Sequence, residues 1–308
     1  MSETEDAYDL PLMKIGVQLP EVERPVRWDE VRDIAVTIEE CGFDSVWTGD
    51  HLLYRRDSGE VEGPWEAWTS LAAIAEATSR VEIGPLVAST SFHNPAMIAK
   101  FASTVDEISG GRLILGLGAG WNRTEYKAFG FPFDQRVSRF EEAYTVITEL
   151  IRKGSVDFQG LYYTHRDMVL VPSARPDMKI LVGTVGPRML RIGLSEADMW
   201  NSWFDAYGNR AAGLAELHDR VDEACMDIGR EPSEVERTVA VYVQLAQGPL
   251  RNYGDETNVR VQPISGTREQ IAEELQSFKD VGISHLQVVL DPIDASSVEQ
   301  LATILQLD

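Results

Sequence analysis

The stretch VWTGDHLL (46–53) passes from two large apolar residues, through a Thr-Gly pair, to two ionisable residues, Asp50 and His51. A short apolar run of this kind predicts a buried β-strand, and its polar end marks the point where the chain leaves the sheet. The same unit recurs along the chain as an apolar run, a polar exit and then an amphipathic helix. This repetition decides the fold.

Eight segments carry the apolar run. They are KIGVQLP (14–20), SVWTGDH (45–51), VEIGPLVAS (81–89), RLILGLGAG (112–120), KILVGTVG (179–186), ADMWNSW (197–203), TVAVYVQLA (238–246) and HLQVVLD (285–291). Helical spacing of apolar residues predicts helices at 28–41, 68–78, 94–109, 138–153, 213–228 and 268–281. The segment 156–172 has aromatic and β-branched residues on both sides of Gln159-Gly160, which predicts a hairpin-like insertion.

Repeated strand–helix units predict an α/β fold, a TIM (β/α)₈ barrel with insertions after strands 4 and 7. A doubly wound sheet is the alternative, but such a fold would be expected to carry a G-x-G-x-x-G turn after its first strand. Here that strand ends in Gln18-Leu19-Pro20 instead. Residues 1–12 are predicted to form an acidic N-terminal tail, and residues 13–308 a single barrel domain.

Composition restricts the class of partner. The chain has 308 residues, 44% of them apolar, and a formal net charge of −22. Such a surface repels nucleic acids and anionic membranes, so neither is expected as a partner. No apolar run approaches the roughly 20 residues of a membrane helix, and the acidic N-terminus does not resemble a signal peptide. Two cysteines in helical patterns, Cys41 and Cys225, fit a reduced, cytoplasmic protein. The five histidines are scattered, and no metal site is predicted.

In a TIM barrel the active site lies at the C-terminal ends of the strands. Asp50 and His51 would therefore lie on the rim of the barrel, although Asp50 could simply cap the next segment and His51 could be a hydrogen-bonded rim residue. Glu66 could act as an acid or face a helix dipole. The glycines of GTVGPR (183–188) would let the backbone approach an anion, as phosphate sites require.

Three longer stretches carry a family resemblance over about Met13 to Leu290. They are GFDSVWTGDHLL (42–53), IGPLVASTSFHNPAMIAKFASTVDEISGGRLILGLGAGWNRTEY (83–126) and ILVGTVGPRMLRIGLSEADMWN (180–201). In this order and spacing they resemble the bacterial luciferase-like family of flavin and deazaflavin oxidoreductases. The resemblance implies a TIM barrel with a redox ring at its C-terminal end, backed by a non-proline cis peptide expected at Pro85-Leu86.

The resemblance also implies roles for individual residues. His51 would donate or accept the proton that accompanies hydride transfer, Asp50 would orient it or hydrogen-bond the ring, and Glu66 would be a second acid. The implied cofactor-binding residues are Asp50, Pro85, Leu86, Gly118, Ala119, Gly120, Glu125, Arg136, Gly183, Thr184, Val185 and Gly186. The loops 54–65, 121–137 and 248–266 are expected to shape the substrate site.

Two positions distinguish the possible cofactors. The flavin-mononucleotide (FMN) branch of the family typically has an asparagine near the end of strand 4 and an Arg-Tyr pair before the next long helix. These positions are Gly116 and Arg136-Val137 here. The arginine is present, but a glycine stands in place of the asparagine and a valine in place of the tyrosine. LGLGAGW followed by Glu125 is closer to members that use coenzyme F420, a deazaflavin. The glutamate that acts as an acid in the sugar-phosphate dehydrogenase members falls at Trp121.

We therefore predict hydride transfer between coenzyme F420 and a small organic substrate. The alternatives are a two-component FMN monooxygenase that uses reduced flavin and O₂, and a non-catalytic flavin-binding protein. The predicted partners are the substrate, a separate flavin or F420 reductase and, from the resemblance, a second copy in a homodimer. Coenzyme F420 is strongly anionic, so local cations must offset the net charge; the candidates are Arg123, Arg136, Arg188 and Arg191.

Overall fold

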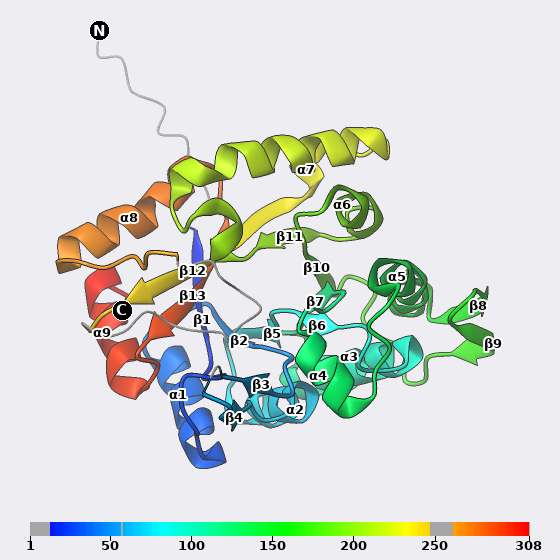
Figure 1. The fold of residues 1–308 in the computed structure, drawn as a ribbon, viewed down its shortest axis with the longest axis horizontal. Helices are drawn as coiled ribbons and strands as arrows, with labels where there is room; N and C mark the ends of the chain where they lie inside the picture. Colours follow the sequence, from blue (N-terminus) through cyan, green and yellow to red (C-terminus); the bar gives the residue numbers. More distant parts are fainter. Residues whose placement is uncertain (1–12, 57, 247–260, 308) are drawn as a thin grey trace, which may run out of the picture.

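The computed structural model describes residues 13–56, 58–246 and 261–307. Figure 1 shows a parallel sheet curled into a barrel with helices around it. The barrel strands are β1 (Lys14–Gln18), β2 (Ser45–Thr48), β5 (Glu82–Pro85), β6 (Ala88–Ser89), β7 (Ile114–Gly118), β10 (Lys179–Gly183), β11 (Met199–Ser202), β12 (Glu236–Gln244) and β13 (His285–Asp291).

The strand order is β5-β2-β1-β13-β12-β11-β10-β7-β6, and every neighbouring pair is parallel. β5 and β6 together form the third strand of the barrel. β5 pairs with β2, whereas β6 pairs with β7, and a parallel bridge between Ile83 and Leu113 closes the ring. The predicted TIM-barrel class is therefore confirmed.

The third strand changes partner at a cis peptide bond between Leu86 and Val87. The cis bond was expected at Pro85-Leu86, and that position is wrong by one bond. The hydrogen bonds show why: the N–H of Leu86 still donates to the carbonyl oxygen of Thr48 at 2.8 Å, so the pairing with β2 continues through Leu86. The third strand leaves β2 only after Leu86, at the bond to Val87.

Glycines let the third and fourth strands of the barrel approach each other. A Cβ at Gly84 would lie 2.3 Å from the carbonyl oxygen of Ile114, and one at Gly116 would lie 2.1 Å from the carbonyl oxygen of Pro85. Both distances are far below van der Waals contact, so no side chain fits at either position. The glycine at 116 is thus explained by backbone packing.

Helices cover the outside of the barrel (Figure 1). They are α1 (Trp28–Glu40), α2 (Ala67–Ala77), α3 (Pro95–Ser109), α4 (Arg123–Phe129), α5 (Arg136–Lys153), α6 (Pro187–Gly193), α7 (Ala215–Asp227), α8 (Arg268–Asp280) and α9 (Ala295–Leu305), with the short 3₁₀ helices η1 (Phe204–Tyr207), η2 (Ala211–Leu214) and η3 (Pro232–Glu234). In α1 the residues that face the barrel are those of the predicted stripe, Val31, Ile34, Ala35 and Ile38. No helix in the described part of the chain is long and apolar enough to cross a membrane.

Two antiparallel hairpins lie outside the barrel. One is β8 (Ser155–Gln159) with β9 (Thr164–Val169), which matches the insertion predicted after strand 4. The other, β3 (Tyr54–Arg55) with β4 (Val61–Glu62), was not predicted, nor were helices α4 and α9. The predicted tail 1–12 lies outside the described residues. So does most of the insertion predicted after strand 7, because residues 247–260 are not described.

Replacement of Gly116 by alanine should destabilise the fold, because the new Cβ would meet the Pro85 carbonyl oxygen in a wall of paired backbone. We expect the free energy of unfolding to fall by about 2 kcal/mol or more in urea titrations. Gly186→Ala is the matched control, since no heavy atom lies within 4 Å of its Cβ position. Equal losses at the two positions would contradict this account.

Candidate active site

All barrel strands are parallel, so their C-terminal ends meet on one rim, and the predicted site residues follow several of these ends. Asp50 and His51 follow β2, and Gly118 ends β7. The structure brings Asp50 and His51 together with a glutamate that was predicted only as a cofactor contact, Glu125. It also adds an acid that was not predicted, Glu21.

His51 lies between two buried carboxylates. Its Nδ1 is 3.0 Å from Oε1 of Glu125, and its Nε2 is 3.7 Å from Oε1 of Glu21. Glu125 has no exposed surface, whereas the His51 side chain keeps 17% of its surface exposed. The imidazole is therefore fixed from inside the protein and remains reachable from outside.

Helix α4 delivers Glu125 to this position. Its N-cap, Asn122, accepts a hydrogen bond from the N–H of Thr124 and donates one of 3.0 Å to the carbonyl oxygen of Leu53. Glu125 itself accepts a 2.9 Å hydrogen bond from the N–H of Leu52. The loop after β2 and the start of α4 are thus bonded to each other at two points, Leu52 and Leu53, directly after His51.

Glu21 is the site residue that sequence reasoning missed. It is 5% exposed and accepts hydrogen bonds from Nε2 of Gln18 at 3.0 Å and from the hydroxyl of Tyr54 at 3.1 Å. Gln18 was recognised as the exit of the first strand, and Glu21 comes directly after Pro20. An acid so close to a strand exit was the available signal.

The carboxylates decide the charge of His51. Burial alone disfavours the imidazolium, but the negative charges of Glu21, Glu125 and Asp50 and the hydrogen bond to Glu125 outweigh it. The pKa of His51 is therefore raised above its usual value. His51 holds its proton more firmly than a free histidine does.

Asp50 is 4% exposed and has a different environment. Its Oδ2 accepts a 2.8 Å hydrogen bond from the N–H of Ser89, at the end of β6. Burial raises the pKa of Asp50 to about 7, against the opposing effects of this hydrogen bond and of His51. Asp50 thus ties the second strand of the barrel to the third and exchanges its proton near neutral pH.

Glu66 lies at the start of a helix, as expected if it faces a helix dipole. It is the N-cap of α2, and its two carboxylate oxygens accept hydrogen bonds from the N–H groups of Trp68 and Thr69 at 2.9 and 2.7 Å. It also acts on Asp50 through space, where its negative charge helps to raise the pKa of that group. A catalytic role for Glu66 stays a prediction.

The predicted glycine positions surround one side chain, Val87, directly after the cis bond. A Cβ at Gly118 would lie 2.6 Å from the Val87 side chain, and one at Gly183 would lie 3.0 Å from it. Val87 therefore lies between the ends of β7 and β10, next to Pro85 and Leu86. The Val87 side chain occupies the space that a Cβ at either position would need, so both glycines are explained by its packing.

The segment from Gly118 to Gly120 is held by Tyr126. The Tyr126 hydroxyl donates to the carbonyl oxygen of Ala119 at 2.7 Å and lies 3.2 Å from Oγ of Ser89. Gly120 has φ of 72°, and a Cβ there would lie 2.2 Å from the Tyr126 oxygen. The glycine is required by both its backbone conformation and this contact.

The loop from Gly183 to Gly186 joins β10 to α6. The N–H of Thr184 donates to the carbonyl oxygen of Asn201 at 3.2 Å, and the N–H of Gly186 is 3.4 Å from the Thr184 hydroxyl oxygen. Part of this loop is therefore engaged by the protein itself. Phosphate binding by the loop, including Val185, stays a prediction.

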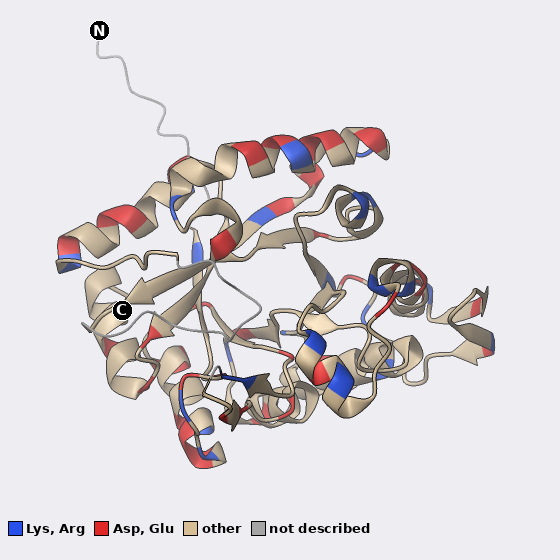
Figure 2. Cartoon of the chain, in the orientation of Figure 1, with Lys and Arg blue, Asp and Glu red and all other residues tan. Residues whose placement is uncertain are grey.

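Two of the four candidate arginines converge. The guanidinium carbons of Arg136 and Arg123 lie 3.7 and 4.1 Å from the centroid of the Phe133 ring. The other two point to acids on the outer helices: Arg188 bonds to Glu141 of α5, and Arg191 lies 3.6 Å from Asp227 of α7. Figure 2 shows how acidic those outer helices are, above all α7 and α8.

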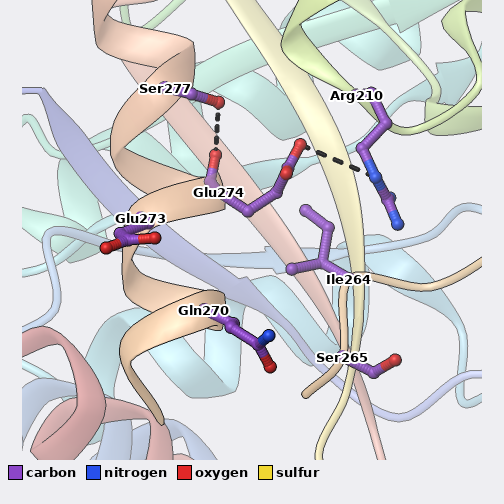
Figure 3. Close-up of a pocket in the computed structure, with 7 residues that line it drawn as sticks. All are labelled: Arg210, Ile264, Ser265, Gln270, Glu273, Glu274 and Ser277. Atoms are coloured by element: carbon purple, nitrogen blue, oxygen red, sulfur yellow. Dashed lines mark hydrogen bonds and ion pairs between the residues drawn. The ribbon is translucent and has the colours of Figure 1, made fainter. Parts of the chain in front are cut away.

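A surface cavity of about 390 Å³ lies elsewhere, between α8 and the segment that contains Ile264 (Figure 3). Its polar groups bond to one another: Arg210 lies 3.6 Å from Glu274, and the Ser277 hydroxyl donates to the Glu274 carbonyl oxygen at 2.6 Å. It contains none of the predicted site residues. The strand ends therefore stay the candidate active site.

A parallel barrel whose strand ends hold a histidine among buried carboxylates defines a TIM-barrel enzyme. The chain belongs to the luciferase-like monooxygenase family, whose family model matches residues 13–251. The predicted resemblance is confirmed, and with it the prediction of an oxidoreductase.

Individual relatives differ in the cofactor that they name. The chain is 28% identical over 296 residues to an F420-dependent glucose-6-phosphate dehydrogenase of Intrasporangium calvum, covering 84% of this chain and 88% of that protein. It is 33% identical over 171 residues to the pyrimidine monooxygenase RutA of Enterobacter cloacae, covering 54% and 47%. Across the curated dehydrogenase relatives, the matched share of the relative's own length ranges from 47% to 88%.

The fold is also shared with a solved structure, an F420-dependent secondary alcohol dehydrogenase in complex with an F420-acetone adduct. The TM-score is 0.80, and the match covers 96% of this chain and 98% of that one. The two sequences are 19% identical, so this likeness concerns the fold.

Asp50 should make stability depend on pH in a defined direction. Its pKa is about 7 in the folded protein and 3.8 as a free side chain. Between these values the folded protein keeps a proton that the unfolded chain has released. The free energy of unfolding therefore falls as pH rises through this window, by about 1.4 kcal/mol per pH unit.

Asp50→Asn should remove this contribution and flatten the pH dependence of urea unfolding between roughly pH 4 and 7. Asp134→Asn, at an exposed carboxylate, is the control and should leave the slope unchanged. A slope in Asp50→Asn as steep as in the parent protein would refute the raised pKa.

Proposed function

We propose that the protein transfers a hydride between coenzyme F420 and an organic substrate, with His51 as the proton carrier. The observation that carries this proposal is His51 itself, an accessible imidazole held by two buried carboxylates on the rim of the barrel. The named F420-dependent dehydrogenases among the relatives support the choice of cofactor.

The strand ends offer a buried polar group to a ring cofactor. Gly118 and Gly183 bring the backbone of β7 and β10 against the Val87 side chain, and the hydroxyl of Thr90 is buried beside Ser89 without a hydrogen-bond partner among the described residues. A buried hydroxyl without a partner is costly, and a bound polar ring would supply one. Arg123 and Arg136 would hold the anionic part of the cofactor, on the side where α4 and α5 begin.

When bound, coenzyme F420 supplies a carbon centre that accepts or releases a hydride. The residues of the chain handle the proton. In the direction of alcohol oxidation, neutral His51 accepts the hydroxyl proton, and in the direction of carbonyl reduction, charged His51 donates it. Glu125 and Glu21 orient the ring, and Asp50, protonated below about pH 7, can donate a hydrogen bond to the cofactor.

The second candidate is an FMN-dependent monooxygenase served by a separate reductase, and the likeness to RutA favours it. The glycine at position 116 disfavours this FMN-dependent alternative, because the backbone there has no room for the asparagine of the FMN branch. An asparagine there, as in the FMN branch, would place its Cβ 2.1 Å from the Pro85 carbonyl oxygen. The third alternative, a flavin-binding protein without activity, gives no reason for the paired carboxylates at His51.

Titration of the purified protein with coenzyme F420 and, separately, with FMN, followed by ligand fluorescence, tests the cofactor. We expect binding of F420 in the micromolar range or tighter and much weaker binding of FMN. Tight binding of FMN alone, with oxygen uptake on reduction, would establish the monooxygenase alternative. Binding of F420 without reduction by any substrate would favour the non-catalytic one.

Glu125→Gln should shift the pH profile of turnover. In alcohol oxidation the rate rises as His51 loses its proton, and the negative charge of Glu125 helps to raise the pKa of His51. Loss of that charge should move the rise in kcat to lower pH, by about one unit. Glu107→Gln, an exposed acid on α3, is the control. An unshifted profile in Glu125→Gln would show that His51 is not the titrating group.

A further inference from the structure

The rim beside His51 is aromatic. The Trp121 ring centroid lies 5.4 Å from that of His51 and 6.1 Å from that of Tyr54. Tyr54 is buried, whereas Trp121 is 38% exposed. An apolar ring surface is thus open to a ligand directly beside the proton carrier.

The same place is strongly acidic. Glu21, Asp50 and Glu125 are each 5% exposed or less, and all three act on His51. Glu66 adds a fourth negative charge that is felt at Asp50. Glu21 and Glu125 lie 3.7 and 3.0 Å from the imidazole, so these two carboxylates outnumber the single positive charge of protonated His51 even when Asp50 is neutral. Charges in a buried setting are poorly screened, so an anionic group brought next to His51 would be repelled.

Three arginines of the neighbouring loops are engaged by other residues. Arg123 and Arg136 lie on the Phe133 ring, and Arg56 bonds to Glu62 through its Nε at 2.7 Å. The segments that follow two further barrel strands are also poor in cations. The segments that follow β11 and β13, residues 203–209 and 292–298, contain Asp205 and Asp294 and neither lysine nor arginine.

We propose that the substrate is an uncharged alcohol, or the matching carbonyl compound, whose apolar ring or chain packs on Trp121, and that sugar phosphates are excluded. This inference rests on the proposed function. On oxidation, the C–H bond of the alcohol carbon breaks and its hydride passes to F420, while the O–H proton passes to His51. The alcohol becomes a carbonyl compound and F420 is reduced, so no further reactant is needed.

The inference is selective among the relatives. Many of them are named as dehydrogenases of glucose 6-phosphate, which carries a dianionic phosphate and a hydroxylated ring. By the family resemblance, Trp121 stands where the sugar-phosphate members have an acid, so an apolar ring lies 5.4 Å from the His51 ring at that position. The fold is the same, but the substrate that it accepts is not.

The test uses the F420-loaded protein with cyclohexanol, 2-octanol, glucose and glucose 6-phosphate, followed by loss of F420 fluorescence. We expect reduction of F420 with the apolar alcohols and a value of kcat/KM at least about tenfold lower with the phosphate. Faster turnover of glucose 6-phosphate, or turnover of none of the four, would overturn the inference. F420 binding in the same samples shows separately whether the proposed function stands.

A binding measurement decides the matter without turnover. Saturation-transfer NMR should show contact between the protein and the ring protons of cyclohexanol, and Trp121→Ala should abolish it, whereas Trp121→Phe should keep it. In the loaded enzyme, Trp121→Ala should raise KM for cyclohexanol about tenfold. Tyr162→Ala, at an aromatic ring of the β8–β9 hairpin that lies against Arg139, is the control. Equal signals in Trp121→Ala and the parent protein would refute contact with this ring.

Discussion

The site depends on the close contact between the third and fourth strands of the barrel. Gly84 and Gly116 allow backbone to lie against backbone there, and the bridge from Ile83 to Leu113 closes the ring at this point. Only a closed ring places the ends of β2, β6 and β7 side by side. The hydrogen bond from Ser89 to Asp50 and the approach of Glu125 to His51 both follow from that closure.

Buried carboxylates set the charge state of His51. One imidazole is surrounded by Glu21, Glu125 and Asp50, and the burial that would otherwise discharge it is outweighed. Burial has the opposite effect on Asp50, because it raises the pKa of this carboxyl group to about 7. Two neighbouring residues, Asp50 and His51, thus have raised pKa values for different reasons: desolvation for the acid, and nearby negative charge for the base.

The net charge of −22 and an anionic cofactor are compatible because charge is arranged locally. Acidic residues cover the outer helices, where they also pair with Arg188 and Arg191 (Figure 2). Arg123 and Arg136 are held instead on one aromatic ring, near the start of α4 and α5. Cation–π contact keeps both guanidinium groups on one ring at the rim of the barrel.

The sequence by itself determined the barrel, because strand and helix periodicities repeat along the chain, and it indicated Asp50 and His51 because they follow a strand. It could not place Glu125 or Glu21 beside His51, since those contacts span 74 and 30 positions of the chain and depend on how α4 and the first strand exit pack. It also gave Glu66 two interpretations, and only the bonds to Trp68 and Thr69 identify the cap. Strand and helix periodicity can be read from the sequence. The proximity and burial that set the pKa values of Asp50 and His51 arise only in the folded protein.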